Sequence, residues 1–530
     1  MTASAVGLTT QRTLGPGSVL GAGSRGAYRV VAELQGEPHL VRRDLAGDSN
    51  PGPVEPKRPL IAIAHITDLH VTDVQSPARF EFVNREWEDP RFRELLTMQR
   101  PQEALNVHAI DAMVRALNAI DAGPVAGGAI SLVAMTGDSI DNTQRNELDN
   151  FLALFDGRTV RPDSGAPGYE GVQSIGWPDD VSWKPDGPGD GDVFRRDLGF
   201  PGVPGLLERA IQPIEATGLR RHWLACYGNH EEVCQGVGVV TPGLARAMAG
   251  SRKPIALPPG IDRETALETF VKHPELFMTG AFLDVTTDVA RRPITRMEFV
   301  AAHRESGPHG FTDKNRIDGT AYYVHDTRAV RFITLDTVCA AGGADGSLDP
   351  PQLHWLERRL EEAHSSFRSR DGSAVRTQHQ DRLVVVLSHH GYDTLANPRA
   401  EPRNDELLEL LLRFDNVVLW LNGHIHGNRI TPRSGPRSRH GLWEVTTSSL
   451  VDWPCQARLV ELFDAGDGLL AIACTMVDHA GTVRRRAGDL PDLAGLHREL
   501  AANVPFNGFD SWRPGKPQDR NVILLLPRPF

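Results

Sequence analysis

Residues 60–73 read LIAIAHITDLHVTD, and this stretch decides the fold. Its first half, residues 60–66, is a short and mostly apolar run rich in isoleucine, which is typical of a buried strand. Its second half is polar and places Asp68 and His70 directly after that strand. Carboxylates and imidazoles both bind metals, so the stretch predicts a buried strand that ends in a polar site.

Four further apolar runs end in the same way, with residues that can bind metals. Helical periodicity separates several of the runs, and strands that alternate with helices predict an α/β core. Ligands of open α/β sheets bind outside the carboxyl ends of the strands, so we expect the five strand ends to converge on one site. The four runs and their polar endings are 129–135 with Gly137 and Asp138, 222–226 with Gly228, Asn229, His230 and Glu231, 383–387 with His389 and His390, and 417–421 with Gly423, His424, Ile425 and His426.

The motifs differ in specificity when each is taken alone: Gly-Asn-His-Glu and Gly-His-x-His are moderately specific, whereas Asp-x-His and Gly-Asp are weak signals. Asp-x-His occurs by chance in many proteins, and Gly-Asp after a strand is common turn chemistry. A single histidine here is more often a satisfied or solvated side chain than a ligand. Asp138 alone could cap a turn or a helix, and Asn229 alone could be a left-handed turn residue. All five motifs in this order, each at a strand end, indicate one metal-binding site.

The ordered motifs resemble those of the calcineurin-like metallophosphoesterase superfamily, whose pattern is D-x-H, GD, GNH-D/E, H and GHxH. The resemblance covers roughly residues 60–475. The stretches AHITDLHVTD, AYYVHDTRAVRFITLDTV and GSLDPPQLHWLERRL are most similar to the class III cyclic-nucleotide phosphodiesterase branch and to related bacterial phosphatases. The resemblance implies an α/β fold of four layers (αββα), in which helices flank two mixed sheets and the metals lie at one edge.

The resemblance also implies a ligand set for two metal ions. The first metal is expected on Asp68, His70 and His426, the second on Asn229, His389 and His424, and Asp138 is expected to bridge both. A hydroxide that bridges the metals would attack phosphorus, because metal binding lowers the pKa of water to about 7. His230 is expected near the leaving oxygen, as proton donor or as a stabiliser of developing charge.

Two details of the site stay open at the level of sequence. Gly391 stands where many members of the family have proline, and alignment with the family pattern makes His389 rather than His390 the ligand. Asp141 and Asn142 either orient metal ligands or cap the helix that follows. The ligand set of oxygen and nitrogen without thiolate suits manganese, iron or zinc, and the sequence does not choose among them.

The motifs also suggest how the chain of 530 residues is divided. We expect an N-terminal extension and linker (1–59), a catalytic domain (60–480) and a C-terminal extension (481–530). Insertions at about 158–221 and 233–320 are longer than usual core connections, so they are lids, subdomains or disordered segments. Their polar and aromatic residues are candidates for substrate binding, namely Trp177, Trp183, His303, Arg304, His309, Lys314 and Arg316.

Composition restricts the partners and the location. The net charge of -11 and the pI of about 6.0 argue against duplex DNA and anionic membranes, which attract basic surfaces. No stretch approaches the ~20 apolar residues of a membrane span, and the N-terminus lacks a signal-peptide pattern. The five cysteines are scattered, which favours reduced thiols. We therefore expect a cytoplasmic protein.

The predicted function is metal-dependent hydrolysis of a small phosphomonoester or phosphodiester, such as a nucleotide. The first alternative is a non-catalytic scaffold on the same fold, although such members lose ligands that this chain retains. The second alternative is a nuclease, against which the acidic balance and the lack of a basic stripe count. The sequence leaves the substrate and the oligomeric state open.

Overall fold

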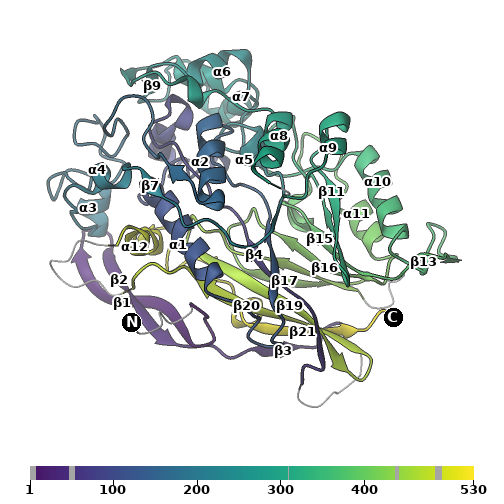
Figure 1. Ribbon diagram of the computed structural model, residues 1–530. Coiled ribbons are helices and arrows are strands. Elements are labelled where there is room, and N and C mark those ends of the chain that lie inside the picture. Colours follow the sequence, from purple (N-terminus) through teal and green to yellow (C-terminus); the bar gives the residue numbers. More distant parts are fainter. Residues whose placement is uncertain (1–6, 47–53, 308, 436–440, 484–491) are drawn as a thin grey trace.

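Two mixed β-sheets form the centre of the computed structural model, which describes residues 7–46, 54–307, 309–435, 441–483 and 492–530 (Figure 1). The seven-stranded sheet has the order β3 (Leu40–Arg42), β21 (Val522–Pro527), β20 (Leu469–Asp478), β19 (Gln456–Gly466), β4 (Arg58–Ile66), β5 (Ile130–Met135) and β8 (Trp223–Ala225). The six-stranded sheet has the order β11 (Tyr323–Asp326), β12 (Val330–Thr334), β15 (Leu383–Leu387), β16 (Val417–Asn422), β18 (Leu442–Thr446) and β17 (Arg429–Arg433).

Each sheet contains a parallel block that ends at the site. In the first sheet β4, β5 and β8 run parallel to one another. In the second sheet β12, β15, β16 and β18 do so. Because carboxyl ends of parallel strands meet at one edge of a sheet, each block delivers the residues that follow its strands to a common place.

The two sheets pack on each other through a shared apolar core. Ile63 and Val133 of the first sheet belong to the same buried cluster as Val385, Leu419 and Val445 of the second. Residues on successive positions of a strand point to opposite faces, so the remaining apolar side chains of the second sheet face outward. The structure therefore confirms the predicted pair of mixed sheets flanked by helices.

Helices cover the outer faces of this pair of sheets (Figure 1). On the second sheet, Leu356 and Leu407 pack with Val384 and Trp420 in a separate buried cluster. The helices are α1 (Asn106–Asn118), α2 (Arg145–Asp156), α3 (Val193–Leu198), α4 (Leu206–Ala210), α5 (Asn229–Glu232), α6 (Pro242–Met248), α7 (Ala266–Lys272), α8 (Arg296–Ser306), α9 (Asp313–Asp318), α10 (Pro350–Glu361), α11 (Asn404–Leu411) and α12 (Leu493–Asn503).

Short elements complete the described chain. The two-stranded sheets pair β1 (Arg12–Ala22) with β2 (Ala27–Gln35), β6 (Thr159–Val160) with β7 (Ile214–Glu215), β9 (Arg252–Pro254) with β10 (Phe282–Asp284), and β13 (Ser366–Arg368) with β14 (Ala374–Arg376). The 3-10 helices are η1 (Pro77–Arg79), η2 (Glu81–Glu86), η3 (Pro90–Leu95), η4 (Glu103–Leu105), η5 (Arg263–Thr265), η6 (Pro274–Met278), η7 (Val289–Arg291), η8 (Tyr392–Thr394) and η9 (Pro517–Asp519).

Both expected extensions contribute strands to the central sheet. β3 pairs in parallel with β21, and β21 pairs with β20. The sequence of residues 491–501, with a proline at its first position, predicts a helix. It corresponds to α12, which begins at Leu493 with Asp492 as its N-cap; Pro491 lies outside the described residues. The division of the chain into domains stays a prediction.

No helix in the described part of the chain has both the length and the apolar character that crossing a lipid bilayer requires.

Candidate metal centre

The predicted ligands from both sheets come together where the parallel strands end. Nε2 of His389, which follows β15, lies 3.1 Å from Oδ2 of Asp138, which follows β5. The same nitrogen lies 4.0 Å from Oδ1 of Asp68, which follows β4. Three side chains far apart in sequence therefore share one small volume between the two sheets.

Asp68, His70 and His426 form a first group of potential ligands. Nε2 of His70 and Nε2 of His426 are 3.2 Å apart, and Nε2 of His426 lies 3.4 Å from Oδ1 of Asp68. All three side chains are buried. Two imidazole nitrogens and a carboxylate oxygen directed at one point form a set that binds a transition-metal ion well.

Asn229, His389 and His424 are the predicted second group, and the two histidines lie with His390 in one cluster of possible ligand atoms. The Asn229 amide donates from Nδ2 to the backbone oxygen of Gly236 at 3.0 Å, and this contact turns Oδ1 toward the site. The rings of His389 and His424 are 5.2 Å apart between centroids. The amide oxygen and the two imidazoles are thus available to a second ion.

Asp138 lies between the two groups. Its Oδ2 is 3.1 Å from Nε2 of His389 in the second group and 3.8 Å from Nε2 of His70 in the first. Its Oδ1 accepts a hydrogen bond from the backbone nitrogen of His230 at 3.0 Å, which fixes the carboxylate. This is the position that a bridging ligand requires.

Three buried ligand atoms make no hydrogen bond to any described residue. They are Oδ1 of Asp68, Oδ1 of Asn229 and Nε2 of His389. A buried polar atom without a partner costs about 1–3 kcal/mol, so three of them in one volume are not expected unless a ligand binds there. The residues therefore fit a pair of metal ions.

Backbone strain is concentrated at the same residues. Ten non-glycine residues in the described ranges have positive φ, and five of them are predicted ligands: Asp68 (52°), His70 (49°), Asp138 (51°), His424 (69°) and His426 (54°). Such conformations cost about 1–3 kcal/mol each, and they cluster at functional sites. The strand ends thus hold these side chains in strained but fixed directions.

Each of three histidines is oriented by an acceptor on its other nitrogen. Nδ1 of His70 lies 3.0 Å from Oδ1 of Asp141, and Nδ1 of His426 lies 2.8 Å from Oδ2 of Asp452. Nδ1 of His389 lies 2.7 Å from the backbone oxygen of Thr136. Such contacts place the proton on Nδ1 and leave Nε2 as the ligand atom.

These contacts bear on two questions left open by the sequence. Asp141 contacts His70, while the N-cap of α2 is Gln144, so the structure favours the orienting role for Asp141. Both nitrogens of His390 are engaged, Nδ1 with Thr337 Oγ1 at 2.9 Å and Nε2 with the backbone oxygen of Ala344 at 3.0 Å. The geometry thus favours His389 over His390 as a ligand.

The electrostatics of the site also favour a cation. Burial by itself lowers the pKa of His389, but the carboxylates of Asp138 and Asp68 outweigh it and raise that pKa to about 9. Burial raises the pKa of Asp68, yet His426 and His389 bring it down to about 2. The carboxylates of Asp138 and Asp68 therefore stabilise a positive charge at Nε2 of His389. A metal ion would supply that charge in place of the proton.

Comparisons with known proteins give structural matches at low similarity. Neither protein-family models nor curated proteins match the chain. A dimetal phosphatase from Danio rerio is 11% identical with a TM-score of 0.37, and the match covers 79% of this chain and 99% of that one. Purple acid phosphatase PPD1 from yellow lupin (Lupinus luteus) seeds is 11% identical with a TM-score of 0.28, covering 84% of this chain and 53% of that one. At these scores the likeness carries no further weight, and the metal centre is defined by its own geometry.

A cleft of about 190 Å³ opens over the two ligand groups. Besides the ligands and His230, residues 94–98 and Arg100 form one wall, residues 235–237 and Ala344 form another, and Arg513 reaches in from the C-terminal segment. Sequence reasoning missed residues 94–100 and Arg513, because neither segment carries a motif.

The seven candidates from the insertions do not line this cleft. Trp183 is buried beside Phe200, with the ring centroids 6.1 Å apart. His303 is buried with its ring 3.9 Å from that of Phe299, and Arg304 and Lys314 form ion pairs with acidic neighbours. Trp183 and His303 pack within the insertions, and the expectation that the seven residues contact substrate finds no support.

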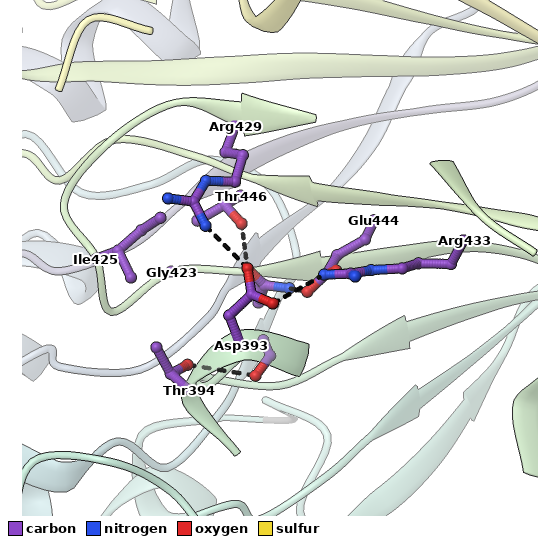
Figure 2. A pocket seen from close by; sticks show the side chains of 10 residues that line it. Asp393, Thr394, Gly423, Ile425, Arg429, Arg433, Glu444 and Thr446 are labelled. Atoms are coloured by element: carbon purple, nitrogen blue, oxygen red, sulfur yellow. Dashed lines mark hydrogen bonds and ion pairs between the residues drawn. The ribbon is translucent and has the colours of Figure 1, made fainter. Parts of the chain in front are cut away.

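A second, much smaller pocket of about 20 Å³ lies beside the loop that carries His424 (Figure 2). Figure 2 shows Asp393 between two arginines, 2.9 Å from Arg429 and 3.5 Å from Arg433. Arg433 also pairs with Glu444 at 2.7 Å. The pocket has room for about one water molecule, so these ion pairs support the loop and do not form a substrate site.

Proposed function

We propose that the protein is a phosphoesterase that uses two metal ions to hydrolyse a small phosphorylated molecule. One observation carries the proposal: two ligand groups meet on Asp138, and three of their buried ligand atoms have no hydrogen-bond partner in the described chain. The oxygen and nitrogen ligands fit manganese, iron or zinc.

We assign the ligands to the two ions as the motif resemblance implies, and the grouping of Asp68, His70 and His426 in one cluster supports the assignment. Asp68, His70 and His426 would hold one ion, Asn229, His389 and His424 the other, and Asp138 both. Bound there, the ions would neutralise the charge of the phosphate and lower the pKa of water at the site to about 7.

His230 is the residue that we assign to the leaving group. Its Nδ1 lies 2.5 Å from the backbone oxygen of Asp141, so the neutral ring donates there and keeps Nε2 unprotonated. Burial lowers the pKa of His230 to about 4. To protonate a leaving oxygen the ring must first gain a proton, and a phosphate dianion in the cleft favours that uptake.

Arg100 provides a contact for the phosphate itself. Its Nε donates to Asp452 at 2.9 Å and its Nη1 lies 3.5 Å from Glu103, whereas Nη2 makes no hydrogen bond to a described residue. The guanidinium lines the cleft. A charge-assisted hydrogen bond from Nη2 to a phosphate oxygen would hold the ester against the metals.

The catalytic proposal explains the site better than the alternatives do. A scaffold on this fold would not need His230 at the cleft or three ligand atoms held without partners. A nuclease would need a basic track for the nucleic-acid backbone, and the net charge of -11 opposes it. The choice between monoester and diester, and a cytoplasmic location, stay predictions.

The test is turnover of p-nitrophenyl phosphate and bis-p-nitrophenyl phosphate by metal-stripped protein with and without added manganese. We expect metal-dependent turnover that falls about 100-fold or more in Asp138→Ala, because that variant loses the shared ligand. Asp326→Ala is the matched control. Asp326 is the last residue of the edge strand β11, where it pairs with Arg331 and Arg382 and contacts none of the predicted metal ligands. The preferred ester separates a monoesterase from a diesterase. No turnover of either ester by metal-loaded wild type would contradict the proposal.

A further inference from the structure

A chain of buried polar contacts begins at each histidine of the first ligand group. From His70 it passes through Asp141, at 3.0 Å, to the guanidinium of Arg79. The Arg79 side chain is only 1% exposed. Asp141 fixes the orientation of the His70 ring, and Arg79 in turn holds Asp141. A residue that holds Arg79 in place therefore also influences the orientation of His70.

The chain from His426 has the same construction. It passes through Asp452, at 2.8 Å, to Nε of Arg100, which lies 2.9 Å from the other oxygen of that carboxylate. Asp452 is completely buried. On the side away from Nε2, each of the two histidines thus contacts a carboxylate, and that carboxylate contacts a guanidinium group.

The two chains meet on one residue, Glu103. Its Oε2 lies 2.5 Å from Nη2 of Arg79, and its Oε1 lies 3.5 Å from Nη1 of Arg100. The Glu103 side chain is 2% exposed and sits on η4, just before α1. It contacts neither ligand histidine, so its influence on them passes through the two arginines and the two aspartates.

We propose that Glu103 is a positioning residue for the first metal: it holds Arg79 and Arg100 so that Asp141 and Asp452 aim Nε2 of both histidines at one ion. The inference rests on the proposed function only in assuming that Asp68, His70 and His426 bind a metal. Carboxyl and guanidinium groups alternate along the whole path, so an amide at its centre places a donor against one of the two arginines. The second ligand group is held otherwise, with His389 oriented by a backbone oxygen.

The chain offers a matched control for Glu103. Glu81 is also a carboxylate with a 2% exposed side chain, and it pairs with Lys253 at 2.6 Å. Lys253 makes its other hydrogen bonds to the backbone oxygens of Val74 and Ser76. Replacing Glu81 by glutamine therefore disturbs a similar buried ion pair that does not lead to a ligand histidine.

The experiment is titration of metal-free full-length protein with manganese by calorimetry, in Glu103→Gln and Glu81→Gln. We expect Glu103→Gln to weaken one of the two sites about 10- to 100-fold and to leave the other unchanged, as loss of an orienting partner does. Glu81→Gln should bind both ions as wild type does. Wild-type affinity at both sites in Glu103→Gln, or an equal loss at both, would overturn the inference.

A second variant covers the case in which Glu103→Gln does not fold. Arg100→Lys keeps the charge but cannot bridge Asp452 and Glu103 together, so it should weaken the same single site. Unchanged binding in that variant would also contradict the inference. The titration does not depend on turnover: if wild type binds two ions but hydrolyses no ester, the proposed function fails and the role of Glu103 stands.

Discussion

At the scale of single residues, the candidate metal centre combines several features that raise the free energy of the folded chain. Buried ligand atoms lack hydrogen-bond partners, and the ligand residues Asp68, His70 and Asp138 adopt left-handed backbone conformations. Cations bound there would offset these costs, because they would bind the folded site and not the unfolded chain. The protein should accordingly be more stable with metal than without it.

The raised pKa of His389 leads to a pH dependence of the metal-free protein. The pKa is about 9 in the folded protein against an ordinary 6.5, so protonated His389 stabilises the fold fully below pH 6.5, and this contribution is lost as the pH rises through 9. Unfolding in urea with a chelator present should show the loss, worth up to about 3 kcal/mol. The loss should be absent in His389→Gln and kept in His390→Gln, whose ring is engaged with Thr337 and Ala344. Equal pH slopes in wild type and His389→Gln would refute the assignment.

The predicted ligands could be read from the sequence because each one follows a strand with a recognisable motif. Their supporting residues could not. Arg79, Glu103 and Arg513 come from segments without a motif, and only the folded chain brings them to the site. Nothing local to Asp452 in the sequence indicates that it contacts His426.

At the scale of elements, the turns that follow the strands pack so closely that a side chain does not fit at two of their glycines. A Cβ on Gly228 would lie against Oδ1 of Asp138 and 2.5 Å from its backbone nitrogen. A Cβ on Gly391 would lie 2.5 Å from Oε1 of Glu444. The glycines of these turns thus allow the ligand loops to pack closely.

Gly228→Ala should therefore displace Asp138 and weaken the binding of both metal ions. Its φ of -112° suits alanine, so the effect comes from the clash and not from backbone strain. We expect the manganese concentration that gives half-maximal binding to rise about 10-fold or more. Gly176→Ala, where nothing lies within 4 Å of the added Cβ, is the control. Equal manganese binding in the two variants would show that Gly228 does not hold Asp138 in place.

The buried strands were the easiest elements to predict, and β15 (Leu383–Leu387) has the predicted bounds. The helical periodicity of residues 102–120 predicts one helix, but the segment begins as the 3-10 turn η4, and α1 follows from Asn106. No strand was predicted at β17, whose sequence RITPR lacks apolar alternation, because its position is set by pairing with β18. Tertiary contacts decide such elements, and local sequence does not.

At the scale of the whole molecule, segments near both ends of the chain complete the seven-stranded sheet at the edge opposite to β5 and β8. β21 is buried between β20 and β3, and Leu524 belongs to the main apolar core. The continuous apolar run of residues 522–526 indicates a strand there, but it does not tell which neighbour the strand pairs with. Residues 235–237 of the second insertion and Arg513 of the C-terminal segment also line the cleft. No local sequence pattern indicates this.

Leu524→Ala should lower the free energy of unfolding by about 2–5 kcal/mol, because it opens a cavity in the core. Leu40→Ala on the adjacent β3, where the side chain is 42% exposed, should change it by about 0.5 kcal/mol or less. Urea unfolding of the metal-loaded proteins measures both. A similar, small change in the two variants would mean that β21 is not part of the core.

The most direct measurement of the central claim is the anomalous scattering from crystals of manganese-loaded protein. Two peaks should flank Asp138, one beside His70 and His426 and the other beside His389 and His424, about 3.5–4 Å apart. A single peak, or two peaks away from Asp138, would contradict the account of a two-metal phosphoesterase site.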